Sequence, residues 1–148
     1  MNWDPAFVAQ LGGIFALLTF AHFVVDWGFQ THYEAMNKAT NRWVRAHHCA
    51  IYTMGFVPII IGFNQSLYWW EAALALNILF WSHYFEDTYV LVYLWAKHAR
   101  RIPSVRLDGI EAFKAEFQRP LGLVLFIVID QIIHLTFLWP IAYMFLTK

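Results

Sequence analysis

Four long apolar segments constrain the fold of this chain more than any other feature of its sequence. They lie at about residues 7–30, 44–63, 67–96 and 121–146. A helix needs about 20 predominantly apolar residues to cross a bilayer, and each segment meets that length. Backbone inside lipid must satisfy its own hydrogen bonds, which favours helices. We therefore predict a single membrane domain over residues 1–148, with four transmembrane helices and the lipid bilayer as partner.

Composition and charge agree with a membrane protein and exclude several other classes. Only 14% of the residues are charged, whereas a soluble domain usually carries about 25%. Ten basic residues balance ten acidic ones, so the chain lacks the positive excess of a nucleic-acid-binding protein, and no nucleic-acid partner is expected. The single cysteine, Cys49, excludes an internal disulfide and a cysteine-rich zinc site.

The basic residues predict how the spans are oriented. The connection between the first two spans contains Lys38, Arg42 and Arg45, and the next connection, "NQSLYWW", contains no basic residue. The connection between the third and fourth spans contains six, namely Lys97, Arg100, Arg101, Arg106, Lys114 and Arg119. The positive-inside rule places both basic connections in the cytoplasm, so both termini are expected on the non-cytoplasmic side.

A short amphipathic helix is expected between the third and fourth spans, at about 109–118. Ile110, Phe113 and Phe117 recur there at helical spacing with charged residues between them, which is typical of a helix on a membrane surface. The predicted fold class is an all-α integral membrane protein. It is an antiparallel four-helix transmembrane bundle with this surface helix between spans three and four.

Three of the four predicted spans contain a histidine and an aspartate four residues, or about one turn, apart. Residues at that spacing share one face of a helix. The pairs are His22 with Asp26, His83 with Asp87, and Asp130 with His134. The order is reversed in the fourth span, as an antiparallel helix requires if all three aspartates are to lie toward the cytoplasmic side.

This regularity predicts a metal site inside the membrane. An ionisable residue at membrane depth is a candidate functional residue by default. Imidazole and carboxylate ligands suit zinc, iron or manganese, and such ligands in bundle cores build di-metal centres. The predicted ligands of one or two divalent ions are His22, Asp26, His83, Asp87, Asp130 and His134. Additional ligands, or hydrogen-bond partners of the ligands, are expected among Gln30, His47, His48 and Gln131.

Simpler interpretations of the same residues stay open. Each histidine–aspartate pair could be an intrahelical hydrogen bond, and Gln30 and Gln131 could join helices without serving a site. His47 and His48 lie near a membrane interface, where histidines need no special role. Glu86 neighbours Asp87 on a different helix face and is expected to pair with a loop cation. Haem ligation by two histidines would leave the acids unexplained, so haem is not expected.

At these residues the sequence resembles domain-of-unknown-function family 3307, a group of small bacterial membrane proteins. The matching motifs are His22 with Asp26, Gln30-Thr31, Asn37-Lys38, His47 or His48, His83 with Asp87, and Asp130-Gln131 followed by His134. The chain departs from the pattern at Val25, where the family tends to have glycine. The resemblance implies a polytopic protein of the bacterial inner (cytoplasmic) membrane. It implies no activity, because the family's function is not established.

Three functions fit this pattern, and the sequence alone does not decide whether the protein is an enzyme. The first is a membrane-embedded metal-dependent hydrolase of a lipid-like substrate. No G-x-S-x-G nucleophile motif is present, so an activated water would have to attack. The second is a proton or metal transport component, because chains of Asp and His form relays in membranes. The third is a non-catalytic subunit of a larger membrane complex. Other membrane subunits or further copies of the chain are therefore candidate partners.

Overall fold

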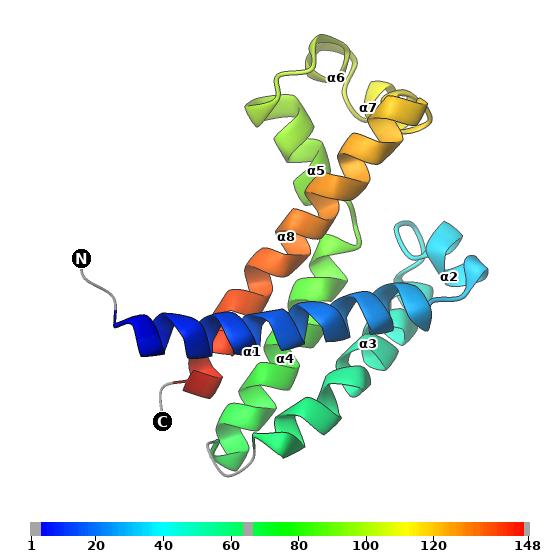
Figure 1. Cartoon of the computed structure of the whole chain (residues 1–148). Coiled ribbons are helices and arrows are strands. Elements are labelled where there is room, and N and C mark those ends of the chain that lie inside the picture. Colours follow the sequence, from blue (N-terminus) through cyan, green and yellow to red (C-terminus); the bar gives the residue numbers. More distant parts are fainter. Residues whose placement is uncertain (1–3, 64–66, 147–148) are drawn as a thin grey trace.

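Long helices dominate the structure (Figure 1). The computed structural model describes residues 4–63 and 67–146, and all elements in these ranges are helical. The long helices are α1 (Pro5–Phe23), α3 (Arg42–Gly62), α4 (Trp69–Glu86) and α8 (Pro120–Leu146). α8 packs against both α1 and α4, and α3 packs against α4. The shorter elements lie between them: η1 (Val24–Gly28), α2 (His32–Asn37), α5 (Val90–Leu94), η2 (Trp95–Ala99), α6 (Pro103–Asp108) and α7 (Ile110–Phe117).

Among residues 4–63 and 67–146, three helices are long and apolar enough to cross a membrane. They are Pro5–Gly28, Arg42–Gly62 and Pro120–Leu146, which correspond to the predicted first, second and fourth spans. Much of their surface faces outward; Phe20, for example, is 69% exposed. Large apolar side chains that point away from a protein core are expected to contact lipid or another protein. α4, with 18 residues, is not among these three helices.

The third apolar segment is not the continuous helix that the sequence predicts. α4 ends at Glu86, and α5 begins only at Val90. The backbone N–H of Tyr89 bonds to the carbonyl of Glu86 at 2.9 Å, which tightens the last turn. Tyr89 itself has a positive φ of 59°, and a left-handed residue ends a helix. The break leaves Asp87 at the end of α4, with its side chain fully buried.

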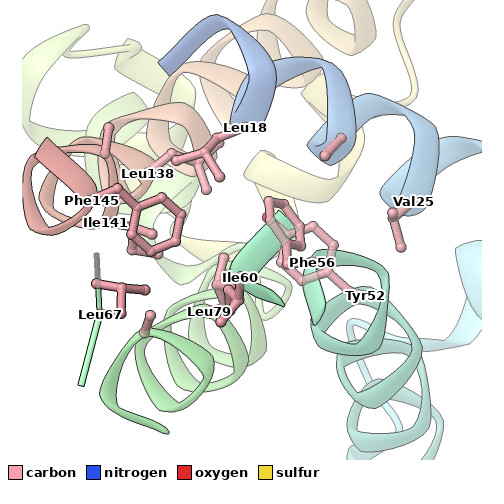
Figure 2. Close-up of a cluster of buried hydrophobic side chains, with 13 residues drawn as sticks. Leu18, Val25, Tyr52, Phe56, Ile60, Leu67, Leu79, Leu138, Ile141 and Phe145 are labelled. Atoms are coloured by element: carbon pink, nitrogen blue, oxygen red, sulfur yellow. The ribbon is translucent and has the colours of Figure 1, made fainter. Parts of the chain in front are cut away.

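Two apolar clusters hold the helices together, and a polar layer lies between them. The larger cluster, drawn in Figure 2, includes Leu18 of α1, Phe56 of α3 and Leu138 of α8. The smaller cluster includes Val92 of α5 and Phe126 of α8. Along α8, the residues from Asp130 to His134 separate the two clusters. Along the third segment, the residues from His83 to Asp87 do the same. The apolar clusters therefore fix the helices on both sides of these polar side chains.

A glycine in α3 allows the end of the first span to approach closely. A Cβ added at Gly55 would overlap the side chain of Val25 in η1. The family resemblance leads us to expect glycine at position 25. In this chain the glycine of the contact is Gly55, on the facing helix α3. Close contact between the two helices is thus preserved with valine at position 25.

The helix predicted at about 109–118 corresponds to α7. Its Phe113 and Phe117 pack against Phe126 of α8, with ring centroids 4.9 and 5.6 Å away. Glu111 and Lys114 are exposed and form an ion pair at 2.7 Å. The apolar face of α7 is therefore occupied in large part by α8.

Candidate metal centre

Four side-chain atoms converge on one point in the polar layer. They are Oδ1 of Asp26, Nε2 of His48, Nε2 of His83 and Oδ2 of Asp87. The Asp26 oxygen lies 3.0 Å from His48 and 3.3 Å from His83. The two ring nitrogens are 3.0 Å apart, and the Asp87 oxygen lies 3.5 Å from each of them. All four side chains are at most 2% exposed.

These distances match those between ligands of one small metal ion. With metal–ligand bonds of about 2.0–2.2 Å in a tetrahedron, neighbouring ligand atoms lie about 3.3–3.6 Å apart. His48 Nε2 is within 3.5 Å of three other ligand atoms. A single N–H cannot donate to all three at once, whereas a cation at the centre would contact every one. The donor set, two imidazoles and two carboxylates, suits zinc, iron or manganese.

The local structure of the first span places Asp26. α1 changes from an α-helix to the π-helical turn η1 at Val24. A π-turn inserts one residue into the helical register, and such turns are frequent at functional sites. Asp26 lies in this turn, so its carboxylate is turned toward α3 and α4 rather than continuing the face of α1.

The segment after η1 brings a lysine into the site. Thr31 and Glu34 form a reciprocal capping box at the start of α2, with bonds of 2.8 and 3.2 Å. Glu34 also accepts a hydrogen bond from His47 Nδ1 at 2.8 Å. Burial raises the pKa of Glu34, but the bonds from Thr31 and His47 outweigh it and lower the pKa below its usual value. α2 is therefore held against α3, and the residue that follows it, Lys38, points inward.

Lys38 is the cation of the site. Its Nζ lies 2.8 Å from Asp87 Oδ1, 3.4 Å from Asp26 Oδ1 and 3.3 Å from His48 Nε2. Burial lowers the pKa of Lys38, but the charges of Asp87 and Asp26 outweigh this effect and raise the pKa above its usual value. The side chain is therefore an ammonium ion. It holds one oxygen of Asp87 and leaves the other facing the histidines.

A second group of potential ligands lies beside the first. It consists of His83, Glu86 and His134, whose ligand atoms all lie within 4.8 Å of one another. His134 Nε2 is 3.3 Å from Glu86 Oε2, and both side chains are 2% exposed. A third such group contains Cys49 with His83 and Asp87. His83 belongs to all three groups and is therefore the central residue of the cluster.

His22 and Gln131 form a hydrogen-bonded chain next to these groups. His22 Nε2 donates to Gln131 Oε1, and His22 Nδ1 accepts from the hydroxyl of Tyr52, both at 3.0 Å. Gln131 Nε2 then donates to Asp130 Oδ2 at 3.4 Å. The ring of Tyr52 stacks on His83 at 3.8 Å between centroids. Both ring nitrogens of His22 therefore form hydrogen bonds, which hold the side chains of Tyr52 and Gln131.

The structure brings together four of the six predicted ligands. Asp26, His83 and Asp87 belong to the first group, and His134 belongs to the second. His22 Nε2 lies 3.9 Å from Asp26 Oδ2 but is held by its hydrogen bonds. Asp130 lies at the edge, with a side chain that is 15% exposed and Oδ2 3.8 Å from His134 Nδ1.

The four additional candidates have different surroundings. His48 joins the first group directly, whereas the side chain of His47 is 69% exposed and contacts Glu34. Gln131 bonds to His22. Gln30 donates to the backbone carbonyl of Asp26 at 3.1 Å and accepts from the N–H of Ala35 at 3.3 Å, so it supports the backbone of η1.

Three site residues escape the sequence prediction. In the sequence analysis, Lys38 serves only as a basic residue of the connection between the first two spans, although Asn37-Lys38 is also part of the motif on which the family resemblance rests. Glu86 is expected to pair with a loop cation but faces His134 instead, at the point where α4 ends. Tyr52 follows His48 by one helical turn, and that spacing is the signal that could have identified it.

The fold and the site define a class of protein: an all-helical chain with candidate membrane-spanning helices around a buried cluster of histidines and carboxylates. The chain belongs to the family described as protein of unknown function (DUF3307), which matches residues 14–148. This confirms the resemblance seen in the sequence, and the match covers every residue of the cluster. No curated protein and no solved structure matches the chain.

Proposed function

We propose that this protein is a membrane-embedded metalloprotein in which Asp26, His48, His83 and Asp87 hold a divalent ion. Zinc, iron and manganese fit the donors best. The observation that carries the proposal is the convergence of four buried ligand atoms: the two ring nitrogens are 3.0 Å apart, and each carboxylate oxygen lies 3.0–3.5 Å from both of them. These four ligands and Lys38 come from four separate segments of the chain. Their close approach is therefore poorly explained by chance.

The charges of the site also favour a bound cation. Asp26 and Asp87 contribute two negative charges, and Lys38 compensates one of them. One uncompensated charge then remains in surroundings that are almost fully buried, where an unpaired charge is costly. A divalent ion supplies positive charge at the point where the carboxylates and imidazoles meet.

A cavity whose lining includes residues that follow Lys38 and Asp87 in sequence supports hydrolysis of an amphiphilic substrate. It has a volume of about 360 Å³ and is lined by Ala39, Thr40, Thr88 and Tyr89 together with residues 110, 113, 114, 117 and 118. Its polar wall directly follows Lys38 and Asp87 in sequence, and its apolar wall is α7. A divalent ion in the cluster would polarise an ester and acidify a water. The substrate we propose is a lipid-like ester with its tail against α7 and its head toward Lys38.

We further propose an antiparallel four-helix bundle in the bacterial inner membrane, with α4 as the remaining span. Both termini would lie on the non-cytoplasmic side, because the basic connections of the chain favour the cytoplasm. α2, α6 and α7 would then lie at the cytoplasmic face. Further copies of the chain or other membrane subunits would cover the exposed apolar side chains that lipid does not.

One observation favours a second candidate function. Lys38 Nζ is only 2.8 Å from Asp87 Oδ1, so an internal ammonium could be the sole cation of the cluster. The polar layer would then fix the helix register of a non-catalytic subunit, or carry protons in a transport component through its Asp and His residues. Neither function requires a metal ion with a fixed stoichiometry.

Metal content of the purified protein separates the two candidates. The protein is extracted in detergent without chelator, and its metals are measured by mass spectrometry. We expect zinc, iron or manganese at a stoichiometric level in the wild type and its loss in His48→Gln. His47→Gln is the matched control, because the neighbouring histidine is 69% exposed and outside the cluster. Metal absent from the wild type, or retained equally by both variants, would overturn the proposal.

Hydrolysis has its own test. Metal-loaded protein in mixed micelles is incubated with carboxylic and phosphoric esters of long-chain alcohols, and product is measured against the His48→Gln variant. Turnover by the wild type alone is the expected result. A metal-loaded protein that cleaves none of these esters would leave the metal centre in place and exclude the hydrolase.

A further inference from the structure

We propose that Glu86 and His134, together with Oδ1 of the shared Asp87, form a second cation site beside the first, so that the centre is dinuclear. The inference rests on the proposed metal centre, because Asp87 contributes to both sites. Its evidence is separate, however, since it comes from the hydrogen bonds and the unpartnered atoms of α4 and α8.

The protonation of His134 is fixed by its backbone contact. His134 Nδ1 lies 2.8 Å from the backbone carbonyl oxygen of Asp130. A carbonyl oxygen only accepts hydrogen bonds, so Nδ1 carries the proton and donates. In the neutral ring, Nε2 then presents a lone pair. This is the arrangement by which a backbone carbonyl orients a histidine that binds a metal ion.

That lone pair faces another acceptor. His134 Nε2 is 3.3 Å from Glu86 Oε2, and two acceptors at this distance repel one another unless a proton or a cation lies between them. Within the described part of the chain, one buried atom of each residue has no hydrogen-bond partner: Nε2 of His134 and Oε1 of Glu86. Buried polar atoms are rarely left unpartnered. A cation bound by these residues would give each of these buried atoms a binding partner.

Asp87 connects this group to the first one. Its Oδ2 faces His48 and His83, whereas its Oδ1, which also pairs with Lys38 at 2.8 Å, lies 3.8 Å from His134 Nε2. A carboxylate with one oxygen toward each ligand group is suited to bridge two ions. Histidines and carboxylates from facing helices build di-metal centres of this kind in soluble bundles.

The second ion also determines which substrate the centre would attract. Two divalent ions and Lys38 carry five positive charges, and Asp26, Glu86, Asp87 and Asp130 carry four negative ones. The loaded centre is then net positive in a buried site. We therefore infer that the substrate head is anionic, such as a phosphate ester, rather than neutral.

The competing explanation is a single proton shared by His134 and Glu86. It would remove the repulsion without any ion. The wild-type metal stoichiometry decides between the two without relying on a variant that could misfold. Apoprotein in detergent is dialysed against Mn²⁺, washed, and its manganese is counted per chain, and electron paramagnetic resonance then tests whether the ions are magnetically coupled.

We expect two manganese ions per wild-type chain with a coupled signal. Glu86→Gln should reduce the count to one and leave an uncoupled signal, whereas Glu111→Gln is the matched control on an exposed glutamate. One ion per wild-type chain, unaffected by Glu86→Gln and lost in His48→Gln, would overturn the second site and preserve the first. No bound ion in the wild type would overturn both.

A separate experiment tests whether the head group of the substrate is anionic. Inorganic phosphate is added to the two-manganese protein, and the spectrum is recorded before and after. The expected result is a change in the coupled signal of the wild type and of Glu111→Gln, and no change in the uncoupled signal of Glu86→Gln. No change in the wild type would contradict an anionic substrate.

Discussion

The two ligand groups of the polar layer differ in how their negative charge is compensated. Asp26 and Asp87 have Lys38 between them, at 3.4 and 2.8 Å. Among the described residues, Glu86 has no lysine or arginine within ion-pair distance, only His134. The first group can therefore remain partly neutralised when no metal is bound, whereas the second depends on a proton or a metal ion. The second group should therefore respond more strongly than the first to the removal of a bound metal ion.

The largest effect is expected from Lys38→Met. The substitution leaves two buried carboxylates without their ammonium ion, and breaking a buried ion pair typically costs about 3–5 kcal/mol. We expect this loss in the free energy of unfolding of metal-free protein, and we expect added zinc to restore most of it. Chemical denaturation in detergent, with and without zinc, measures both. A variant that zinc does not rescue would mean that Lys38 is the only cation the first group accepts.

Gly55→Ala should lower stability without changing metal content. The added Cβ overlaps Val25, and overpacking of this kind costs about 1–3 kcal/mol. The double variant Val25→Gly with Gly55→Ala should recover stability, because it returns a small residue to the contact. Thermal unfolding and metal analysis of the three proteins provide the measurement. Metal loss in Gly55→Ala at full stability would contradict a purely apolar role for this contact.

Tyr52→Phe should cost about 1 kcal/mol, the usual net value of one hydrogen bond. The variant removes the hydroxyl that donates to His22 at 3.0 Å but keeps the ring that stacks on His83. We expect the metal to remain bound with full stoichiometry. If the metal were lost instead, His22 would have to be a ligand rather than a residue that positions its neighbours.

The smallest effect concerns the pH dependence contributed by Glu34. Its folded pKa lies below its usual value of 4.5, so its contribution to stability is present above that value and is lost as the pH falls through the folded pKa. Glu34→Gln should therefore flatten the stability profile below about pH 4.5. Melting temperatures from pH 3 to 6 (a range of about one to two units around the usual carboxyl pKa) would show it. An unchanged acid limb would mean that the bonds to Thr31 and His47 do not persist in solution.

Much of the cluster could be predicted because the number of residues between each histidine and its aspartate can be read directly from the sequence. Residues four apart share a helix face, so each histidine–aspartate pair could be recognised without any knowledge of the fold. The choice between His47 and His48 could not be made in this way. The choice depends on how α3 is rotated about its axis relative to α4. In the structure His48 is buried beside Asp26, whereas His47, one residue earlier, is exposed beside Glu34.

The remaining site residues depend on breaks in regular structure. Glu86 reaches His134 where α4 ends, and Lys38 reaches Asp87 because α2 folds back after η1. The apolar run from 67 to 96 contains no proline or glycine that would announce the break. The left-handed residue is Tyr89, a residue type that seldom adopts that conformation. Hydrophobic pattern alone therefore predicts a longer helix there.

X-ray absorption at the zinc edge tests the metal centre most directly. We expect detergent-purified, zinc-loaded protein to show nitrogen and oxygen ligands at about 2.0–2.1 Å, with the outer-shell scattering of imidazole rings. His48→Gln should reduce the imidazole scattering, and His47→Gln should leave it unchanged. Zinc that binds without imidazole, or a protein that retains no zinc, would contradict a centre built on His48 and His83.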